Sequence, residues 1–158
     1  MNKDLQIAKE TVKAEIEALK KLSSSFNRSS HFSKAVNALS KMKGKCLVIG
    51  VGKSYIVSLK VSATLSSLGT PSVAFSANDL QHGGLGAIQK NSDVLLIFSV
   101  SGESSELNSI LRYANRHNIP AIGVSCKATS MLLRYSTIKV LLPKVVEAGH
   151  SLAPTSSY

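Results

Sequence analysis

The segment Val94-Leu95-Leu96-Ile97-Phe98-Ser99-Val100-Ser101-Gly102-Glu103-Ser104-Ser105-Glu106 decides the fold of this 158-residue chain. It begins as an apolar run of strand length and ends as a turn rich in hydroxyl groups. Further apolar residues follow at helical spacing, which predicts a helix over 103–117. The segment therefore predicts a strand that delivers Ser-x-Ser-Gly-x-Ser to the N-terminus of a helix.

Such a junction is typical of an anion-binding site. Free backbone N–H groups and the helix dipole face the ligand, and Ser99, Ser101 and Ser104 add neutral donors. The carboxylates of Glu103 and Glu106 would repel a phosphate unless they point elsewhere, for example at the rest of the ligand. A phosphate site beside a possible base is what an enzyme acting on a sugar phosphate needs.

The same alternation of apolar strands and helices continues on both sides of this segment. Strands are predicted at 46–49, 72–75, 94–98, 121–124 and 138–142, with helices at 53–68, 103–117 and 130–134 and a glycine-rich loop at 77–91. Strands that are apolar throughout have both faces covered. The chain is therefore predicted to be an α/β protein with a five-stranded, parallel, doubly wound sheet. Ligands bind such sheets at the carboxyl ends of the strands, where the turns after Ile49, Phe98 and Leu142 can converge.

Two helices are predicted before the sheet, at 3–22 and 33–42, so that residues 1–43 form a helical segment and 44–158 the sheet domain, in a single domain overall. An apolar stripe on the first helix is suited to packing on another subunit or on the chain's own sheet; it consists of Leu5, Ala8, Val12, Ile16 and Leu19. In the second helix, Phe32, Val36 and Leu39 are expected to point inward. The final Thr155-Ser156-Ser157 resembles a helix start, so the last helix is expected to be truncated at Tyr158.

Composition narrows the class of protein. A hydrophobic content of 44% and a charged content of 18% are typical of a globular protein. The N-terminus lacks the apolar region of a signal peptide and no run is long enough to span a membrane, so a cytoplasmic location is predicted. Cys46 and Cys126 are expected to be reduced, and the histidines and cysteines show no metal-ligand spacing.

The net charge of +10 allows two interpretations. Nucleic-acid binding is one. The other is a solvated helix face together with attraction for an anionic substrate, and we favour it because no nucleic-acid-binding motif accompanies the charge.

Gly50-Val51-Gly52-Lys53-Ser54 looks like a phosphate loop but fails two tests. A Walker loop needs glycine at position 47, where the chain has leucine, and a dinucleotide fingerprint needs glycine at position 55, where it has tyrosine. A tight strand-to-helix turn that presents Lys53 and Ser54 remains, and an ordinary helix start with an exposed lysine is the alternative.

Two further segments carry polar groups at predicted strand ends. His82-Gly83-Gly84-Leu85-Gly86 follows the second strand, and its glycines allow the backbone to approach a ligand closely. A merely structural or exposed His82 is the alternative. The segment from Glu147 to Ser157 follows the fifth strand and includes Thr155 and Ser156 at the expected helix start.

Taken in order, these blocks resemble the sugar isomerase (SIS) domain, with its flavodoxin-like fold. The order Gly-x-Gly-Lys-Ser, His-Gly-x-Leu-Gly, Ser-x-Ser-Gly-Glu-Ser-Ser-Glu and Leu-Ala-Pro-Thr-Ser-Ser, over residues 44–157, is most similar to the arabinose-5-phosphate isomerase family. The resemblance implies interconversion of D-arabinose 5-phosphate and D-ribulose 5-phosphate through an enediol. It further implies synthesis of the Kdo sugar of lipopolysaccharide or capsule, no organic cofactor, and homodimers or homotetramers.

The resemblance also assigns roles to residues. The catalytic set that it implies is Lys53, His82, Glu106 and Glu147. The substrate-binding set that it implies is Gly52, Ser54, Ser99, Ser101, Glu103, Ser104, Thr155 and Ser156. No metal ligand is implied.

Four features depart from the family pattern. Gly84 replaces the usual aspartate, and the segment after Glu147 is one residue shorter than usual. A downstream histidine and paired CBS domains would lie beyond Tyr158. Because SIS domains also occur in regulators, a non-catalytic sugar-phosphate sensor and an isomerase of another sugar phosphate stay open as alternatives.

Overall fold

The computed structural model describes residues 2–26 and 30–147, and the chain divides into two compact units. One unit comprises Met1–Ser29 with Leu142–Tyr158 and contains helix α1 (Lys3–Phe26). The other unit, Ser30–Leu141, contains all the strands and the remaining helices. Among the described residues, no helix has the length and apolar character that crossing a bilayer requires.

The unit Ser30–Leu141 is built on a five-stranded sheet of order β2-β1-β3-β4-β5, in which all neighbouring strands pair in parallel. The strands are β1 (Cys46–Gly50), β2 (Ser72–Ser76), β3 (Val94–Phe98), β4 (Ala121–Ser125) and β5 (Ile138–Leu141). The helices are α2 (Ser30–Ser40), α3 (Lys53–Ser67), α4 (Ala77–Gln81), the 3-10 turn η1 (Gly84–Ala87), α5 (Leu107–Arg116) and α6 (Met131–Tyr135). The predicted α/β fold with a five-stranded parallel sheet is confirmed.

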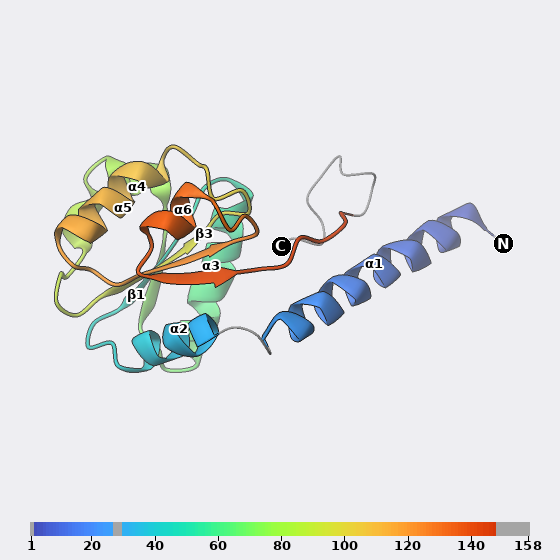
Figure 1. The fold of residues 1–158 in the computed structure, drawn as a ribbon, viewed down its shortest axis with the longest axis horizontal. Coiled ribbons are helices and arrows are strands. Elements are labelled where there is room, and N and C mark those ends of the chain that lie inside the picture. Colours follow the sequence, from blue (N-terminus) through green and yellow to red (C-terminus); the bar gives the residue numbers. More distant parts are fainter. Residues whose placement is uncertain (1, 27–29, 148–158) are drawn as a thin grey trace. The chain divides into compact units, whose positions relative to one another are not determined.

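Helices cover the sheet on both sides. Figure 1 shows α4, α5 and α6 on one side of the sheet and α2 on the other, while α3 packs against β1 and β2. The central strands β1 and β4 are buried along their whole length. The edge strands differ from the prediction, since β2 is half-buried and β5 alternates between half-buried and exposed residues. Only strands with a neighbour on each side and a helix on each face become fully buried.

The order of the strands creates a switch point between β1 and β3. From β1 the chain crosses to β2 on one side, and from β3 it crosses to β4 on the other. A crevice at the carboxyl ends of the strands is expected where the crossovers diverge in this way. The apolar core below it includes Leu47, Ile49, Leu95 and Ile97, each with no exposed surface.

Three predicted helices differ from those observed. α1 continues to Phe26, beyond the predicted end at residue 22, and the hydroxyls of Ser24 and Ser25 donate to backbone carbonyls of the preceding turn. In α2 it is Ala35 that is buried, whereas Phe32 and Val36 are about half exposed, so their predicted inward orientation is wrong. α5 begins at Leu107 rather than at 103, and residues 103–106 form a turn.

The apolar stripe of α1 stays exposed in the described chain. Leu5, Val12, Ile16 and Leu19 each keep about half of their surface or more in contact with solvent, between 46% and 64%. The predicted contact of this stripe with another subunit stays a prediction.

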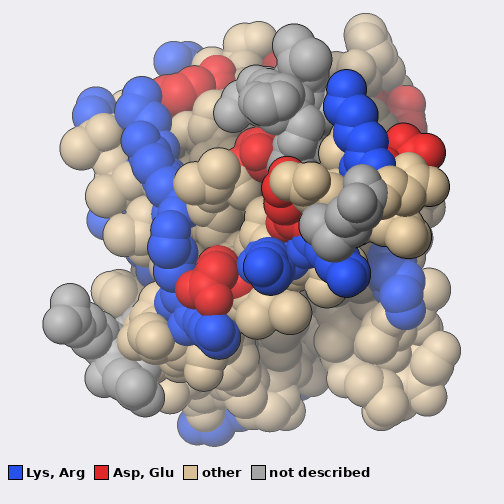
Figure 2. Space-filling model, turned by 90° about the vertical axis from the view of Figure 1, so that its right-hand side faces the viewer, with Lys and Arg blue, Asp and Glu red and all other residues tan. Residues whose placement is uncertain are grey.

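Charged side chains of both signs are mixed on the face of the molecule drawn in Figure 2, where acidic groups lie between the lysines and arginines. One example is the exposed ion pair on α1 between Glu17 and Lys20, in which Oε1 lies 2.8 Å from Nζ. A nucleic-acid-binding surface is instead expected to gather positive charge in a continuous patch or stripe. Along α1 itself glutamates lie among the lysines, which agrees with the interpretation of a solvated helix face.

A buried ion pair anchors the start of β3. The Asp93 side chain has no exposed surface and accepts hydrogen bonds from the Lys45 backbone N–H at 2.9 Å and the Gln89 backbone N–H at 2.8 Å. It also pairs with the Lys45 ammonium group, whose Nζ lies 2.9 Å from Oδ2. Burial by itself raises the pKa of Asp93, but these hydrogen bonds and the lysine charge outweigh it and hold the pKa below its ordinary value.

We expect Asp93→Asn to lower the free energy of unfolding by about 3 kcal/mol near pH 7, because the variant leaves the ammonium group of Lys45 without its counterion. A carboxyl whose pKa is lower in the folded state stabilises the protein above its unfolded-state pKa of about 4, and this contribution is lost as the pH falls through the folded-state pKa. Urea unfolding at neutral and acidic pH should therefore show the difference between wild type and variant shrinking in acid.

The matched control is Glu17→Gln, which removes the exposed pair between Glu17 and Lys20 on α1. It should change stability by less than about 0.5 kcal/mol. An Asp93→Asn variant as stable as the control at neutral pH would contradict the assignment.

Candidate functional site

The turns that follow β1 and β3 leave the same edge of the sheet side by side. Cys46–Ile49 pairs in register with Val94–Ile97, so the two strands end at the same level. The structure therefore brings Gly52, Lys53 and Ser54 to the same edge as the serine loop, which we define as Ser99–Ser104.

The turn after β1 leaves the N-terminus of α3 open. Gly52 is the N-cap of α3 and has φ 55°, a conformation that favours glycine, and no side chain caps the helix. Lys53 is exposed and forms no ion pair with any described residue, whereas Ser54 is 5% exposed. A helix start that no side chain caps, together with a neighbouring ammonium group, suits an anionic ligand.

The serine loop is held by hydrogen bonds among its own residues. The Ser99 hydroxyl accepts from the Gly102 N–H at 3.0 Å and lies 3.2 Å from the Ser104 hydroxyl. The Ser101 hydroxyl accepts from the Glu103 N–H at 3.3 Å. These bonds fold the loop compactly, with Ser99 buried, Ser104 half-buried and Ser101 exposed.

Glu103 points away from this loop toward the segment after β4. Its carboxylate pairs with Lys127 at 2.6 Å and accepts a hydrogen bond from the Met131 N–H at 3.4 Å. The hydrogen bond from Lys127 is the main reason why the pKa of Glu103 lies below its ordinary value. The pairing explains why α5 does not begin at Glu103. The charge of Lys127 also neutralises a carboxylate that would otherwise repel a phosphate.

A side-chain hydrogen bond joins the end of α4 to the loop between β3 and α5. The Gln81 side chain, at the end of α4, donates to the backbone oxygen of Glu106, the N-cap of α5. The exposed His82 follows Gln81 directly and caps the C-terminus of α4. Within the sheet unit, the predicted residues His82 and Glu106 therefore belong to loops that contact each other.

Gln81 and Asp79 also lie in this region, although neither is among the residues predicted from sequence. Asp79 is exposed in the first turn of α4, three residues before His82, so the two lie on one face of a single helical turn. The spacing between the acid and the histidine is a signal that the sequence contains. The sequence predicts mainly a glycine-rich loop here, and in a loop this spacing does not place two side chains on one face. It does so in the structure because α4 is a helix.

The remaining predicted residues do not belong to the unit that contains the sheet. Glu147 belongs to the unit Met1–Ser29 with Leu142–Tyr158, and it is half-buried there. Thr155 and Ser156 lie outside the described residues. The described part of the chain contains no group of three or more metal-ligating side chains. Burial raises the pKa of Cys46 to about 12, so its thiol is a core group rather than a nucleophile at neutral pH.

The order of the strands, the uncapped start of α3 and the serine loop together are the features of a doubly wound α/β domain with a candidate anion site at the carboxyl ends of its strands. The chain belongs to the SIS domain family, whose model matches residues 38–158.

Named relatives and solved structures agree with this family. Over 161 residues the chain is 36% identical to the arabinose 5-phosphate isomerase KdsD of Francisella tularensis, an alignment that covers 99% of this chain and 48% of that protein. The chain thus spans about half the length of the curated relatives it matches. The structure of Escherichia coli CFT073 c3406 in complex with arabinose 5-phosphate matches with a TM-score of 0.87 and 30% identity, over 99% of this chain and 83% of that one.

The fold also occurs in a protein that is not named as an isomerase. The NanR protein of Vibrio vulnificus, complexed with ManNAc-6P, matches with a TM-score of 0.77 at 19% identity, over 96% of this chain and 56% of that one. At that identity the likeness concerns the fold alone.

Replacing Gly102 should disrupt the serine loop. Gly102 has φ 66°, and a Cβ atom there would overlap with the side chain of Ser130. We expect Gly102→Ala to lower the unfolding free energy by about 2 kcal/mol or more and to weaken binding of a sugar phosphate, because backbone strain and overlap act together.

Gly86→Ala is the matched control, since a Cβ atom at Gly86 would meet no atom within 4 Å. Thermal unfolding and calorimetric titration of both variants provide the comparison. Equal stability and equal affinity in the two variants would show that the loop does not depend on Gly102.

Proposed function

We propose that the protein is a sugar-phosphate aldose–ketose isomerase that interconverts D-arabinose 5-phosphate and D-ribulose 5-phosphate. The observation that carries the proposal is the 36% identity with a named arabinose 5-phosphate isomerase across 99% of this chain. The fold shared with the c3406 complex supports the class of ligand.

The phosphate group of the substrate binds at the serine loop in this proposal. The hydroxyls of Ser99, Ser101 and Ser104 provide neutral donors, and the uncapped start of α3 adds the positive end of a helix dipole. Lys53 is the nearby cation. Neutral donors at a helix N-terminus hold a phosphate without the need for several buried lysines or arginines. Thr155 and Ser156 complete the phosphate site, and Gly52 and Ser54 shape its floor.

The reaction moves a proton between adjacent carbons through an enediol. The proton is weakly acidic, so the site needs a positioned base and stabilisation of the negative charge on the carbonyl oxygen. A glutamate, Glu106 or Glu147, is the base. Lys53 stabilises the charge on the substrate oxygens, and His82 orients hydroxyls or assists ring opening.

Glu103 has a positioning role in this proposal rather than a chemical one. Its ion pair with Lys127 ties the serine loop to the segment after β4, so that it acts on the substrate through the loop. Among the described residues, Glu106 is then the carboxylate of the β3–α5 loop that remains for the reaction.

The proposed setting comes from the resemblance to the arabinose-5-phosphate isomerase family. The product feeds synthesis of the Kdo sugar of lipopolysaccharide or capsule, in the cytoplasm and without an organic cofactor. The exposed stripe of α1 joins copies of the chain into a homodimer or homotetramer in this proposal, because burying large apolar side chains is favourable.

Removing the base should abolish turnover while leaving binding intact. We expect Glu106→Gln or Glu147→Gln to lower kcat by about 10²- to 10⁴-fold, the usual contribution of a general base. The measurement is deuterium incorporation at the reacting carbon of ribulose 5-phosphate in deuterated water, with Glu17→Gln as a control. Near-wild-type turnover in both active-site variants would rule out the assignment, and unchanged binding without exchange in the wild type would favour a sensor.

Affinity should depend on the phosphate group. Calorimetric titration is expected to show arabinose 5-phosphate binding at least about 100-fold more tightly than arabinose, because several hydrogen bonds to a charged group are lost together. Ser101→Ala should reduce that preference, whereas Ser105→Ala, which removes a hydroxyl outside the serine loop, should not. Equal affinity for the two sugars would exclude a phosphate site.

A further inference from the structure

Two loops at the carboxyl edge of the sheet are joined by the side chain of Gln81. The Nε2 group of Gln81, in the last turn of α4, donates to the backbone oxygen of Glu106. Glu106 is the N-cap of α5, and the two residues are 25 positions apart in the chain. A carbonyl oxygen has two lone pairs, so the oxygen of an N-cap can accept this bond beside the one that begins its helix. The bond therefore connects the loop that carries Glu106 to the helix that His82 caps.

The helix α4 is too short to hold its own position. It has five residues, whereas isolated helices of fewer than about 12 residues are marginal in water. Ala77 and Leu80 are buried in the same apolar cluster as Leu107, the first residue of α5. Burial in this cluster holds one face of α4, and the bond from Gln81 holds its exposed last turn. The place of α4 beside α5 therefore depends on both contacts.

The position of His82 follows from that of α4. The N–H of His82 donates to the backbone oxygens of Asn78 at 3.3 Å and Asp79 at 3.2 Å, so its backbone continues the last turn of the helix. The bond from Gln81 to Glu106 thus fixes the backbone of one candidate catalytic residue against the backbone next to the other. This geometry matters for proton transfer, because a displacement of about 1 Å can cost on the order of 100-fold in rate.

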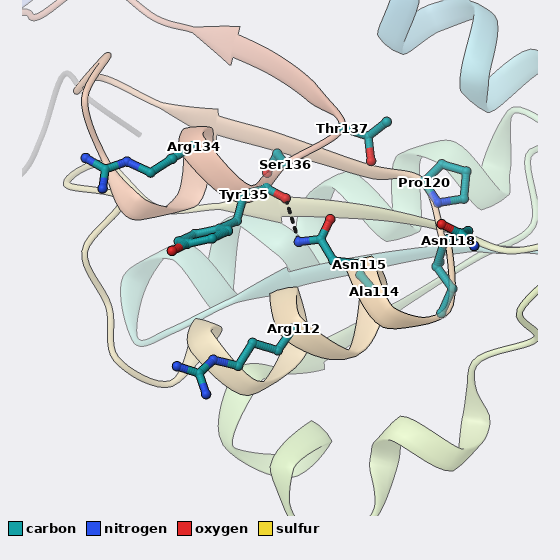
Figure 3. A pocket seen from close by; sticks show the side chains of 10 residues that line it. Arg112, Ala114, Asn115, Asn118, Pro120, Arg134, Tyr135, Ser136 and Thr137 are labelled. Atoms are coloured by element: carbon teal, nitrogen blue, oxygen red, sulfur yellow. Dashed lines mark hydrogen bonds between the residues drawn. The ribbon is translucent and has the colours of Figure 1, made fainter.

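A bond of the same kind holds the opposite end of α5. The Asn115 side-chain amide donates to the backbone oxygen of Tyr135, the last residue of α6, at 3.0 Å. Figure 3 shows this bond beside a cavity of about 760 Å³ between the two helices, whose lining includes Arg112 and Arg134. Asn115 lies nine residues after Glu106, which is about 14 Å along a helix. Asn115 therefore fixes α5 far from the candidate site, whereas the bond to Glu106 fixes it at the site.

We propose that Gln81 is a positioning residue that sets the separation between His82 and Glu106 in the isomerase reaction. This role rests on the proposed function, in which Glu106 is a candidate base and His82 orients hydroxyls or assists ring opening. Gln81 is exposed and adds nothing to the apolar core, so its bond serves the geometry of the two loops more than the stability of the fold. It acts through His82 and Glu106 rather than on the reacting atoms.

The first test replaces Gln81 with methionine, which has a similar length and helix propensity but no hydrogen-bond donor. We expect Gln81→Met to lower kcat for isomerisation of arabinose 5-phosphate about 10- to 100-fold and to change KM less than about twofold, because the serine loop still holds the phosphate. The matched control is Asn115→Leu, which removes the same kind of bond from the other end of α5 and should leave kcat and KM unchanged. Circular dichroism checks that both variants are folded.

A double-mutant cycle shows whether Gln81 acts through Glu106. In the Glu106→Gln background, Gln81→Met should lower kcat by less than about twofold further, because the separation of the two loops no longer matters once the carboxylate is gone. Losses that multiply in the double variant would contradict a role through Glu106.

A measurement on the free protein distinguishes this role from the proposed function. Hydrogen exchange followed by NMR should show the N–H of His82 exchanging at least about threefold faster in Gln81→Met than in the wild type, because the last turn of α4 loses a stabilising bond. Asn115→Leu should leave that rate unchanged. An inactive wild type in which the His82 N–H still depends on Gln81 would refute the proposed function alone. An active wild type with unchanged kcat in Gln81→Met, or an unchanged exchange rate at His82, would overturn the proposal.

Discussion

The parallel register between β1 and β3 is the constraint on which the candidate site depends. Because Cys46–Ile49 lies level with Val94–Ile97, the turn after β1 and the loop after β3 leave the sheet at the same edge. β2 lies beyond β1, and β4 lies beyond β3, so the two crossovers diverge and leave the space between the loops open. A slip of the register would move the serine loop away from Lys53 and turn the buried faces of the strands around.

The serine loop is supported from behind by the segment that follows β4. The Val100 oxygen accepts from the Cys126 N–H at 3.0 Å and from the Ser125 hydroxyl at 3.0 Å, and the Gly102 oxygen accepts from the Leu132 N–H at 2.9 Å. These bonds satisfy loop backbone groups that would otherwise need water. The loop therefore presents its hydroxyls from a fixed backbone, which is what binding of a small anion requires.

Charge is distributed differently at the two edges of the sheet. At the carboxyl edge the serine loop offers mainly neutral hydroxyls, and its carboxylate Glu103 is already paired with Lys127. At the amino-terminal edge the buried charge of Asp93 is matched by Lys45. At both edges a lysine from a distant part of the chain thus neutralises a carboxylate, although only that of Asp93 is buried.

Sequence by itself determined the fold class and the five strands to within a residue or so, because most of the strands are short apolar runs next to glycine, serine or proline. It also located the serine loop and Lys53, since glycine and serine at strand ends have a direct local cause. The α5 boundary was wrong because Glu103 is held by Lys127, which is 24 positions away in the chain.

Tertiary structure alone decided which distant groups meet. Gln81 reaches the backbone of Glu106, and Arg112 and Arg134 line one cavity although neither pair is adjacent in sequence. The outward position of Phe32 and Val36 was also decided by tertiary packing, because the spacing of a helix shows which residues share a face but not which face is buried. Local patterns specify elements, and contacts between residues far apart in the chain depend on how those elements pack.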